Sequence, residues 1–192
     1  VLTGAGDKAF CAGSETPKSN AAATVAGIDK PVIAAINGEA FDDGLELALA
    51  CDIRLASDRA SFRIGQVSWG ELPMNGGTQR LPRLIGKGKA LELILTGETI
   101  NAEEAFNIGL VSKVVPAEKL AAEAEALAQK MAAQAPISLR FVKEAVNKGM
   151  DMTLGQGLRL EGDLYFLLHT TADRTEGIKA FLEKRPPKFT GE

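Results

Sequence analysis

The stretch INGEAFDDGLELALACDIRLAS at residues 36–57 constrains this chain more than any other. It follows the buried-strand run PVIAAI and passes through Asn37-Gly38 and a tight acidic turn into an apolar helix that carries Glu46. The first turn of a helix offers backbone N–H groups without intrahelical partners, and the positive end of the helix dipole lies there. A carboxylate beside such N–H groups is how proteins hold an anion and move a proton. The stretch therefore predicts an enzyme that stabilises an oxyanion.

Short apolar runs alternate with glycine-rich turns in the first half of the chain. The predicted strands are VLTG at 1–4, PVIAAING at 31–38, DIRLA at 52–56 and the run at 61–64. Between them lie the turn AFCAG at 9–13 and the helix that carries Glu46, whereas the small and polar residues at 15–25 predict a loop. This alternation is typical of an α/β fold whose sheet is covered on both faces.

The second half is predicted to be helical. Apolar periodicity and capping residues place helices over 87–96, 101–109, 116–134, 136–149, 153–169 and 173–185. Asn101 is a typical N-cap, and the helix at 136–149 begins with proline and ends with glycine. The prolines of the final RPPKFTGE prevent helix formation, so we expect an extended tail.

Composition excludes several classes of function. The 192 residues carry a net charge of −3 and no long basic run, so we expect no nucleic-acid partner. No apolar run has membrane-spanning length and no segment has the pattern of a signal peptide. Cys11 and Cys51 are typical of small buried residues in a reducing compartment. We therefore expect a cytoplasmic protein with no membrane partner. Because a strand begins at Val1, we also expect earlier strands to be missing.

Five segments of the chain resemble the motifs of one family. They are AFCAGS at 9–14, IDKPVIAAINGEAFDDGLELALACDI at 28–53, GELPMNGGTQRLPRLIG at 70–86, LTGETINAEEAFNIGLVSKVVP at 95–116 and DRTEGIKAFLEKRPPKF at 173–189. Their order and spacing resemble the crotonase superfamily, the group of enoyl-CoA hydratases and isomerases. The resemblance implies a spiral of β-β-α units over 1–134 that lacks its first strands. It also implies a helical C-terminal module over 135–192 that drives assembly into a trimer or a dimer of trimers.

The resemblance also implies a chemistry. Family members bind acyl-CoA thioesters and polarise the thioester carbonyl with two backbone N–H groups, which correspond here to those of Ser14 and Asp43. Such donors act where the charge of an enolate develops. Glu46 corresponds to a catalytic glutamate, and Gln66 occupies the position of the second one. No metal and no redox cofactor is implied, because CoA arrives as part of the substrate. Further residues that the resemblance places near the substrate or CoA are Ala12, Gly44, Trp69, Phe181 and Lys184.

Gln66 is the main departure from the family pattern. An amide can orient water, but it cannot exchange a proton at neutral pH, and neither Met74 nor Asn75 supplies a carboxylate in its place. From the sequence, Gln66→Glu is therefore expected to raise hydration. Asp42-Asp43 is a second departure, because the family usually has glycines there, and two carboxylates oppose an oxyanion unless they point away or are protonated. The loop after Ser14 is also shorter than in the family.

The predicted function is that of an enoyl-CoA hydratase/isomerase-like lyase of fatty acid metabolism that acts through a thioester enolate. Two alternatives remain open. One acid suffices for another outcome of the same enolate, such as isomerisation, decarboxylation or thioester hydrolysis. The departures at Gln66 and at Asp42-Asp43 also fit a catalytically weakened homologue that binds acyl-CoA.

Overall fold

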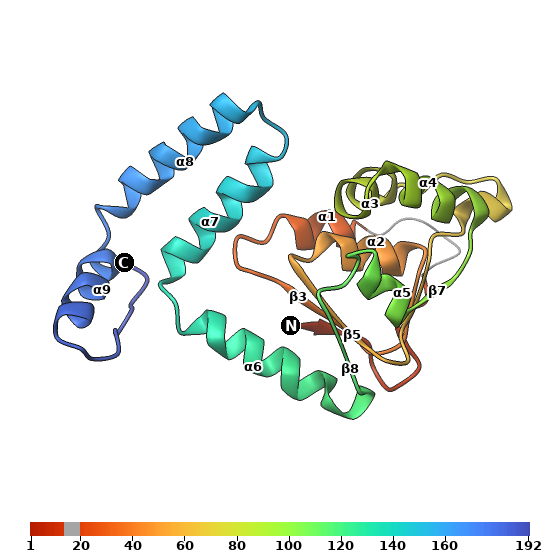
Figure 1. Ribbon diagram of the computed structural model, residues 1–192, viewed down its shortest axis with the longest axis horizontal. Coiled ribbons are helices and arrows are strands. Elements are labelled where there is room, and N and C mark those ends of the chain that lie inside the picture. The colour runs from red at the N-terminus through yellow and green to blue at the C-terminus, as the bar shows by residue number, and fades with distance from the viewer. Residues whose placement is uncertain (14–19) are drawn as a thin grey trace. The chain divides into compact units, whose positions relative to one another are not determined.

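The computed structural model describes residues 1–13 and 20–192, whose course is shown in Figure 1. The chain divides into two units. The first comprises residues 1–28 and 32–126, and the second comprises residues 29–31 and 127–192.

Two four-stranded sheets form the frame of the first unit. One has the strand order β1-β3-β5-β8 with parallel neighbours, and the other has the order β2-β4-β6-β7 with an antiparallel last pair. The first sheet contains β1 (Leu2–Thr3), β3 (Ile33–Ile36), β5 (Ile53–Ser57) and β8 (Lys113–Val115). The second contains β2 (Ala9–Cys11), β4 (Glu39–Phe41), β6 (Ser61–Arg63) and β7 (Ile100–Asn101). Every residue of β3 is buried, which explains its unbroken apolar sequence.

From β1 to β6, consecutive strands enter alternate sheets, so the chain advances as a spiral. The pairs β1 and β2, β3 and β4, and β5 and β6 each place one strand in either sheet before a helix follows. These helices are α1 (Ala21–Ala26), α2 (Asp43–Ala50) and, after the 3-10 turn η1 (Gln66–Trp69), α3 (Gly77–Ile85). This repeated β-β-α order confirms the predicted α/β spiral.

The spiral continues into α4 (Lys87–Thr96), α5 (Ala102–Asn107), the 3-10 turn η2 (Ala117–Lys119) and α6 (Leu120–Ala132). Asn101 caps α5 as predicted, because its side-chain oxygen accepts the backbone N–H of Glu104 at 2.9 Å. The helices and sheets enclose an apolar core that includes Leu45, Leu49, Phe62, Ile64, Leu81 and Leu93. This core fixes α2 and α3, the two helices whose N-terminal ends build the site described below.

Several short elements differ from the sequence prediction. β4 lies where a turn was predicted, β2 lies within the predicted AFCAG turn, and β7 and β8 fall in the half predicted to be helical. Strands of two or three residues carry no readable alternation, and their partners are distant in sequence. α1 occupies part of the predicted loop at 15–25. Ala22 is buried and α1 packs against α2, so tertiary packing sustains a helix too short to be stable alone.

The second unit continues with α7 (Pro136–Gly149), α8 (Leu154–Leu168) and α9 (Ala172–Leu182), close to the predicted bounds. α7 packs against α8. Thr153 and Gln156 form a reciprocal capping box at the start of α8, and the Thr171 side chain caps α9.

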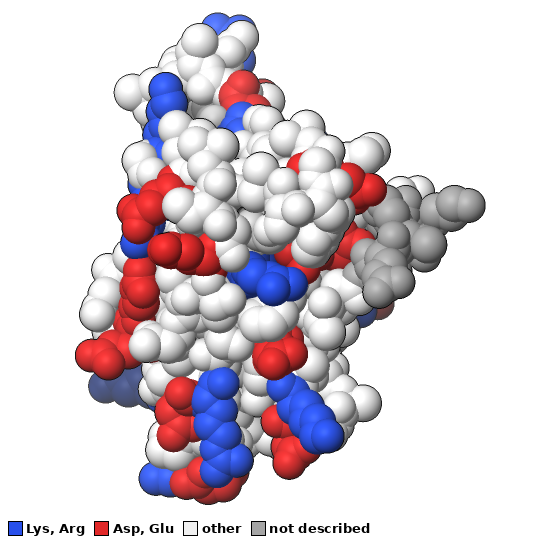
Figure 2. Space-filling model, turned by 90° about the vertical axis from the view of Figure 1, so that its right-hand side faces the viewer, with Lys and Arg blue, Asp and Glu red and all other residues white. Residues whose placement is uncertain are grey.

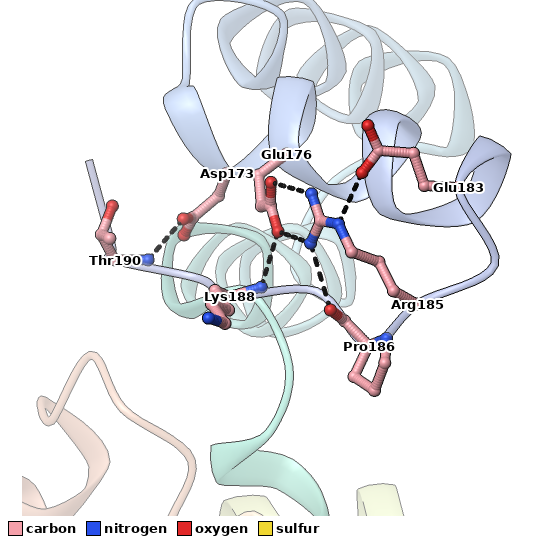
Figure 3. Close-up of polar contacts among 7 residues, drawn as sticks. All are labelled: Asp173, Glu176, Glu183, Arg185, Pro186, Lys188 and Thr190. Carbon is pink, nitrogen blue, oxygen red and sulfur yellow. Dashed lines mark hydrogen bonds and ion pairs between the residues drawn. The ribbon is translucent and has the colours of Figure 1, made fainter.

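Polar contacts bind the C-terminal tail to α9 (Figure 3). The buried Asp173 accepts the backbone N–H groups of Thr190 and Gly191 at 2.6 and 3.0 Å. Glu176 accepts two bonds from the Arg185 guanidinium, at 2.6 and 2.9 Å, and one from the backbone N–H of Lys188 at 2.8 Å. The prolines keep this tail out of a helix, and the acids of α9 satisfy its backbone.

Charges of both signs are interspersed on the face of the molecule that Figure 2 shows. This agrees with the absence of a long basic run from the sequence. Among the described residues, none of the helices has both the length and the apolar character that crossing a membrane requires.

Candidate active site

Glu46 lies in the first turn of α2, as the sequence predicted, and its side chain is fully buried. Its Oε1 atom accepts the backbone N–H groups of Asn75 and Gly77, each at 2.7 Å. Its Oε2 atom accepts the side-chain Nε2 of Gln66 at 3.3 Å. The structure thus brings the two predicted catalytic side chains together from α2 and η1, and three donors fix the orientation of the carboxyl group.

Opposing effects act on the pKa of the Glu46 carboxyl group. Burial raises the pKa of this carboxyl group, because water no longer stabilises its charge. The N–H groups of Gly77 and Asn75 work in the other direction, and the neighbouring Asp43 carboxylate raises the pKa further. The net direction is upward, which suits a group that gives and takes a proton near neutral pH.

The loop before α3 is shaped to present N–H groups to Glu46. Gly76 has a φ of 106°, and a Cβ atom on Gly77 would lie 3.1 Å from Glu46 Oε1 and 3.0 Å from Pro73 Cβ. The guanidinium of Arg80 donates to the carbonyl oxygen of Asn75 at 2.7 Å and so anchors the loop. The GGT sequence therefore begins α3 and also orients Glu46.

Asp43 is the acidic neighbour of the Glu46 carboxyl group. Its Oδ1 atom accepts the Nδ2 group of Asn75 at 3.2 Å, and its Oδ2 atom is buried without a hydrogen-bond partner among the described residues. As the first residue of α2, Asp43 has a backbone N–H with no acceptor inside the helix. A Cβ atom on Gly13 would lie 3.7 Å from that nitrogen, so the AFCAG turn adjoins it. Ser14, the other predicted donor, lies outside the described residues.

Asp42 is held by a different set of residues from Glu46. Its carboxylate accepts the backbone N–H of Gly65 at 2.6 Å and pairs with the Arg63 guanidinium at 3.0 Å. Arg63 in turn lies over the ring of Phe41, 4.7 Å from its centroid. One of the two acids that stand in place of the family's glycines is therefore neutralised by a cation.

A pocket of about 240 Å³ opens beside these groups. It is lined by Asp42, Asp43, Gln66, Trp69, Glu71, Leu72 and Met74. Gln66 is almost completely buried, whereas Trp69 is about half exposed and forms part of the wall. Met74 and Leu72 add exposed apolar surface, so the pocket joins acidic groups to an apolar rim.

The other predicted binding residues belong to several elements of both units. Gly44 is buried, and a Cβ atom there would overlap the carbonyl oxygen of Cys11, so this glycine lets α2 approach β2. Ala12 is exposed and precedes Gly13 in the turn. Phe181 is exposed near the end of α9 in the second unit, and Lys184 follows that helix. Within the described residues, no group of three or more histidine, cysteine, aspartate or glutamate side chains is arranged to hold a metal ion.

Sequence reasoning missed the roles of Asn75, Arg63 and Arg80. Asn75 contacts both Glu46 and Asp43, Arg63 neutralises Asp42, and Arg80 anchors Asn75. In the sequence, Asn75 stands out only as a position that lacks a carboxylate. A signal was present, because the doubled acids at 42–43 require a cation or a proton nearby.

Comparisons with known proteins identify the family of this chain. The family model described as enoyl-CoA hydratase/isomerase matches residues 15–192. The chain is 45% identical to the (E)-benzylidenesuccinyl-CoA hydratase of Thauera aromatica, covering 100% of this chain and 80% of that protein. It is 41% identical to the crotonyl-CoA hydratase of Syntrophomonas wolfei subsp. wolfei, covering 98% and 79%.

A solved structure gives the same result for the fold. The crystal structure of enoyl-CoA hydratase from Bacillus anthracis superposes with a TM-score of 0.93 at 44% identity, covering 99% of this chain and 80% of that one. The identities and coverage establish descent as well as fold. The chain belongs to the enoyl-CoA hydratase/isomerase family of acyl-CoA enzymes, as its five motifs predicted.

Proposed function

We propose that the chain adds water across the α,β double bond of an enoyl-CoA thioester. The observation that carries this proposal is Glu46, a buried carboxyl group of raised pKa that lies beside a pocket and beside Asp43, whose backbone N–H has no acceptor within α2. In the proposed reaction Glu46 takes a proton from water, the hydroxide oxygen bonds to the β carbon, and the π electrons move onto the thioester oxygen. The N–H groups of Ser14 and Asp43 hold that oxygen.

The remaining residues have supporting roles. Gln66 orients Glu46 and the water, and Trp69 borders the acyl group. Ala12 and Gly44 contribute backbone near the thioester, and Phe181 and Lys184 contact CoA. CoA enters as part of the substrate, and the chemistry requires no metal or redox cofactor, because proton transfer and an oxyanion hole suffice. A cytoplasmic location remains a prediction of the sequence.

Another outcome of the same enolate is the second candidate. The amide of Gln66 stands where the family has its second acid, and this favours a reaction that moves a proton without adding water. The orientation of Asp42 argues against a weakened homologue, because its charge is paired with Arg63 instead of opposing the oxyanion.

A hydration assay with crotonyl-CoA, run beside a titration of acyl-CoA binding, separates these functions. Conversion to the 3-hydroxyacyl thioester is the expected result. Binding with release of a different product supports isomerisation, decarboxylation or hydrolysis. Binding without turnover identifies a weakened homologue and contradicts the proposal.

Assembly into trimers is the remaining proposal, with 135–192 as the assembly module. The second unit exposes many large apolar side chains, namely Val142, Val146, Met150, Leu154, Leu158, Tyr165, Phe166, Leu167, Ile178, Phe181 and Leu182. Surfaces of this kind mark subunit interfaces. Light scattering at micromolar concentration is expected to report a trimer or hexamer, and a monomer would refute this.

A further inference from the structure

One short segment of the chain carries both the contacts that hold Glu46 and an apolar part of the pocket wall. Gln66 begins the segment and donates to Glu46 Oε2 at 3.3 Å, and Asn75 ends it and donates its backbone N–H to Glu46 Oε1 at 2.7 Å. The residues between them that line the 240 Å³ pocket include three large apolar ones, namely Trp69, Leu72 and Met74. The apolar wall is therefore tied to the carboxyl group that the proposed reaction uses.

The 3-10 turn η1 places Trp69 on the same side of the chain as Gln66. These are the last and first residues of η1, three positions apart, and side chains at that spacing eclipse one another in a 3-10 helix. The backbone N–H of Glu71 donates to the carbonyl oxygen of Gln66 at 3.0 Å and fixes the chain directly after the turn. The indole of Trp69 and the amide of Gln66 consequently border the same pocket.

Leu72 and Met74 extend this wall on either side of a buried proline. Pro73 packs at the start of α3, where a Cβ atom on Gly77 would lie 3.0 Å from Pro73 Cβ. In contrast, the side chains of Trp69, Leu72 and Met74 are each more than half exposed, although all three are large and apolar. An exposed apolar patch that continues a pocket is typical of a ligand-binding groove.

We infer that this wall selects an enoyl-CoA whose acyl group carries an apolar substituent larger than the methyl group of crotonyl-CoA. The inference rests on the proposed hydration and names its substrate class. Pockets that enclose a drug-sized ligand measure about 300–1,000 Å³. The space of about 240 Å³ therefore fits one part of an acyl-CoA. That part is the acyl group, because its β carbon takes up water beside Glu46, and a longer chain then lies against Trp69 and Met74.

A chain seated on this wall is expected to gain in turnover as well as in binding. Each methylene group that leaves water for an apolar surface strengthens binding roughly fourfold. Gln66 and Asn75 hold Glu46 from the same segment, so a seated chain also fixes the β carbon relative to that carboxyl group. The preference should therefore appear in kcat/KM.

The first test is the hydration of trans-2-enoyl-CoA thioesters with linear acyl chains of four, six and eight carbons. We expect kcat/KM of the parent chain to rise about tenfold or more from the shortest to the longest. Trp69→Ala removes the largest apolar side chain of the wall, so this rise should shrink by about threefold or more. Met74→Ala should shrink it as well, and its side chain is mostly exposed, so the fold does not depend on it.

Phe106→Ala is the matched control, because Phe106 is a half-exposed aromatic residue on α5 and is not among the residues that line the pocket. Its kcat/KM should rise with chain length as steeply as that of the parent. A parent kcat/KM that stays level or falls as the chain lengthens would overturn the inference. A rise in Trp69→Ala and Met74→Ala as steep as in Phe106→Ala would overturn it too.

The second test needs no turnover, because Trp69 is the only tryptophan of the chain and reports on the wall by its fluorescence. Saturated butyryl-, hexanoyl- and octanoyl-CoA have no double bond to hydrate. We expect octanoyl-CoA to bind about tenfold or more tightly than butyryl-CoA and to shift the Trp69 emission to shorter wavelength, since the chain displaces water from the indole.

The two tests separate the inference from the proposed function. Equal affinities and equal emission for the three saturated thioesters would refute the apolar substrate class, even if the enoyl thioesters are hydrated. Affinity and emission that depend on chain length, together with no hydration of any enoyl thioester, would refute the hydration reaction and leave the acyl preference of the wall standing.

Discussion

The carboxylate of Asp42 and the guanidinium of Arg63 lie 3.0 Å apart, and Asp42 is the residue directly before the helix that carries Glu46. Asp42 has a φ of 52° and a ψ of −117°, a conformation that favours glycine. Strain of this kind costs on the order of 1–3 kcal/mol. The ion pair and the bond from the N–H of Gly65 offset that cost and neutralise a negative charge beside the pocket.

Substitutions of Asp42 test this balance. Asp42→Ala keeps the strained backbone and removes both contacts, so we expect a loss of about 2–4 kcal/mol in stability. Asp42→Gly also loses the contacts but relieves the strain, and it should be more stable than the alanine variant by about 1 kcal/mol. Urea unfolding of both variants beside the parent chain measures the difference. An alanine variant as stable as the parent would show that the ion pair offsets nothing.

Gln66→Glu now has a different expected outcome from the one that the sequence alone predicts. The sequence treats the missing second acid as the defect, so the substitution should raise hydration. In the structure the Gln66 amide donates to Glu46 Oε2, and Asp43 is already the neighbouring acid. A glutamate would remove that donor and place another carboxyl group beside Glu46 and Asp43.

We therefore expect crotonyl-CoA hydration by Gln66→Glu to fall roughly threefold to tenfold below the parent rate. Gln66→Met is the matched control, because it keeps a similar volume and removes the donor without adding charge. Steady-state kinetics on the three chains measure the effect. A rate above that of the parent would show that the missing second acid limits hydration and that the Gln66 amide does not support Glu46.

The contact between Glu176 and Arg185 predicts how the stability of the C-terminal tail depends on pH. The hydrogen bonds from Arg185 and from the N–H of Lys188 lower the pKa of Glu176 from an ordinary 4.5 to about 2. Because the pKa is depressed on folding, the contribution of Glu176 is fully present above pH 4.5 and is lost as the pH falls through 2.

An NMR titration of the Lys188 amide can follow this carboxyl group directly, since the amide lies 2.8 Å from Glu176 Oε1. We expect its shift to titrate with a midpoint near pH 2, and Arg185→Gln to move the midpoint toward 4.5. A midpoint near 4.5 in the parent chain would mean that Arg185 does not hold the carboxylate.

The helices and the location of Glu46 could be predicted because their signals are local. The bounds predicted at 87–96 and 136–149 are those of α4 and α7, since caps, glycine and proline mark the ends of helices. The Glu46 motif likewise lies in a few consecutive residues. The short strands β4, β7 and β8 were missed because a strand of two or three residues is defined by its partner and not by its own sequence.

The contacts that tune the site could not be predicted. Asn75 reaches Glu46 across 29 positions of sequence, and Arg63 reaches Asp42 across 21. Their approach depends on how the spiral stacks η1 and α3 over α2, which no local pattern encodes. The family resemblance placed Asp43 through its backbone N–H, and only the structure shows that Asn75 bonds both to its side chain and to the Glu46 carboxyl group.

Glu46→Gln is the most direct test of the central claim, that Glu46 moves the proton in a hydration reaction. Glutamine keeps the size of the side chain and removes proton transfer, so kcat for crotonyl-CoA hydration should fall by about 10²-fold or more while acyl-CoA affinity is retained. The measurement is kcat together with the dissociation constant of the thioester on parent and variant. Near-normal turnover with unchanged binding would contradict the account, because Glu46 would then not be the acid–base group.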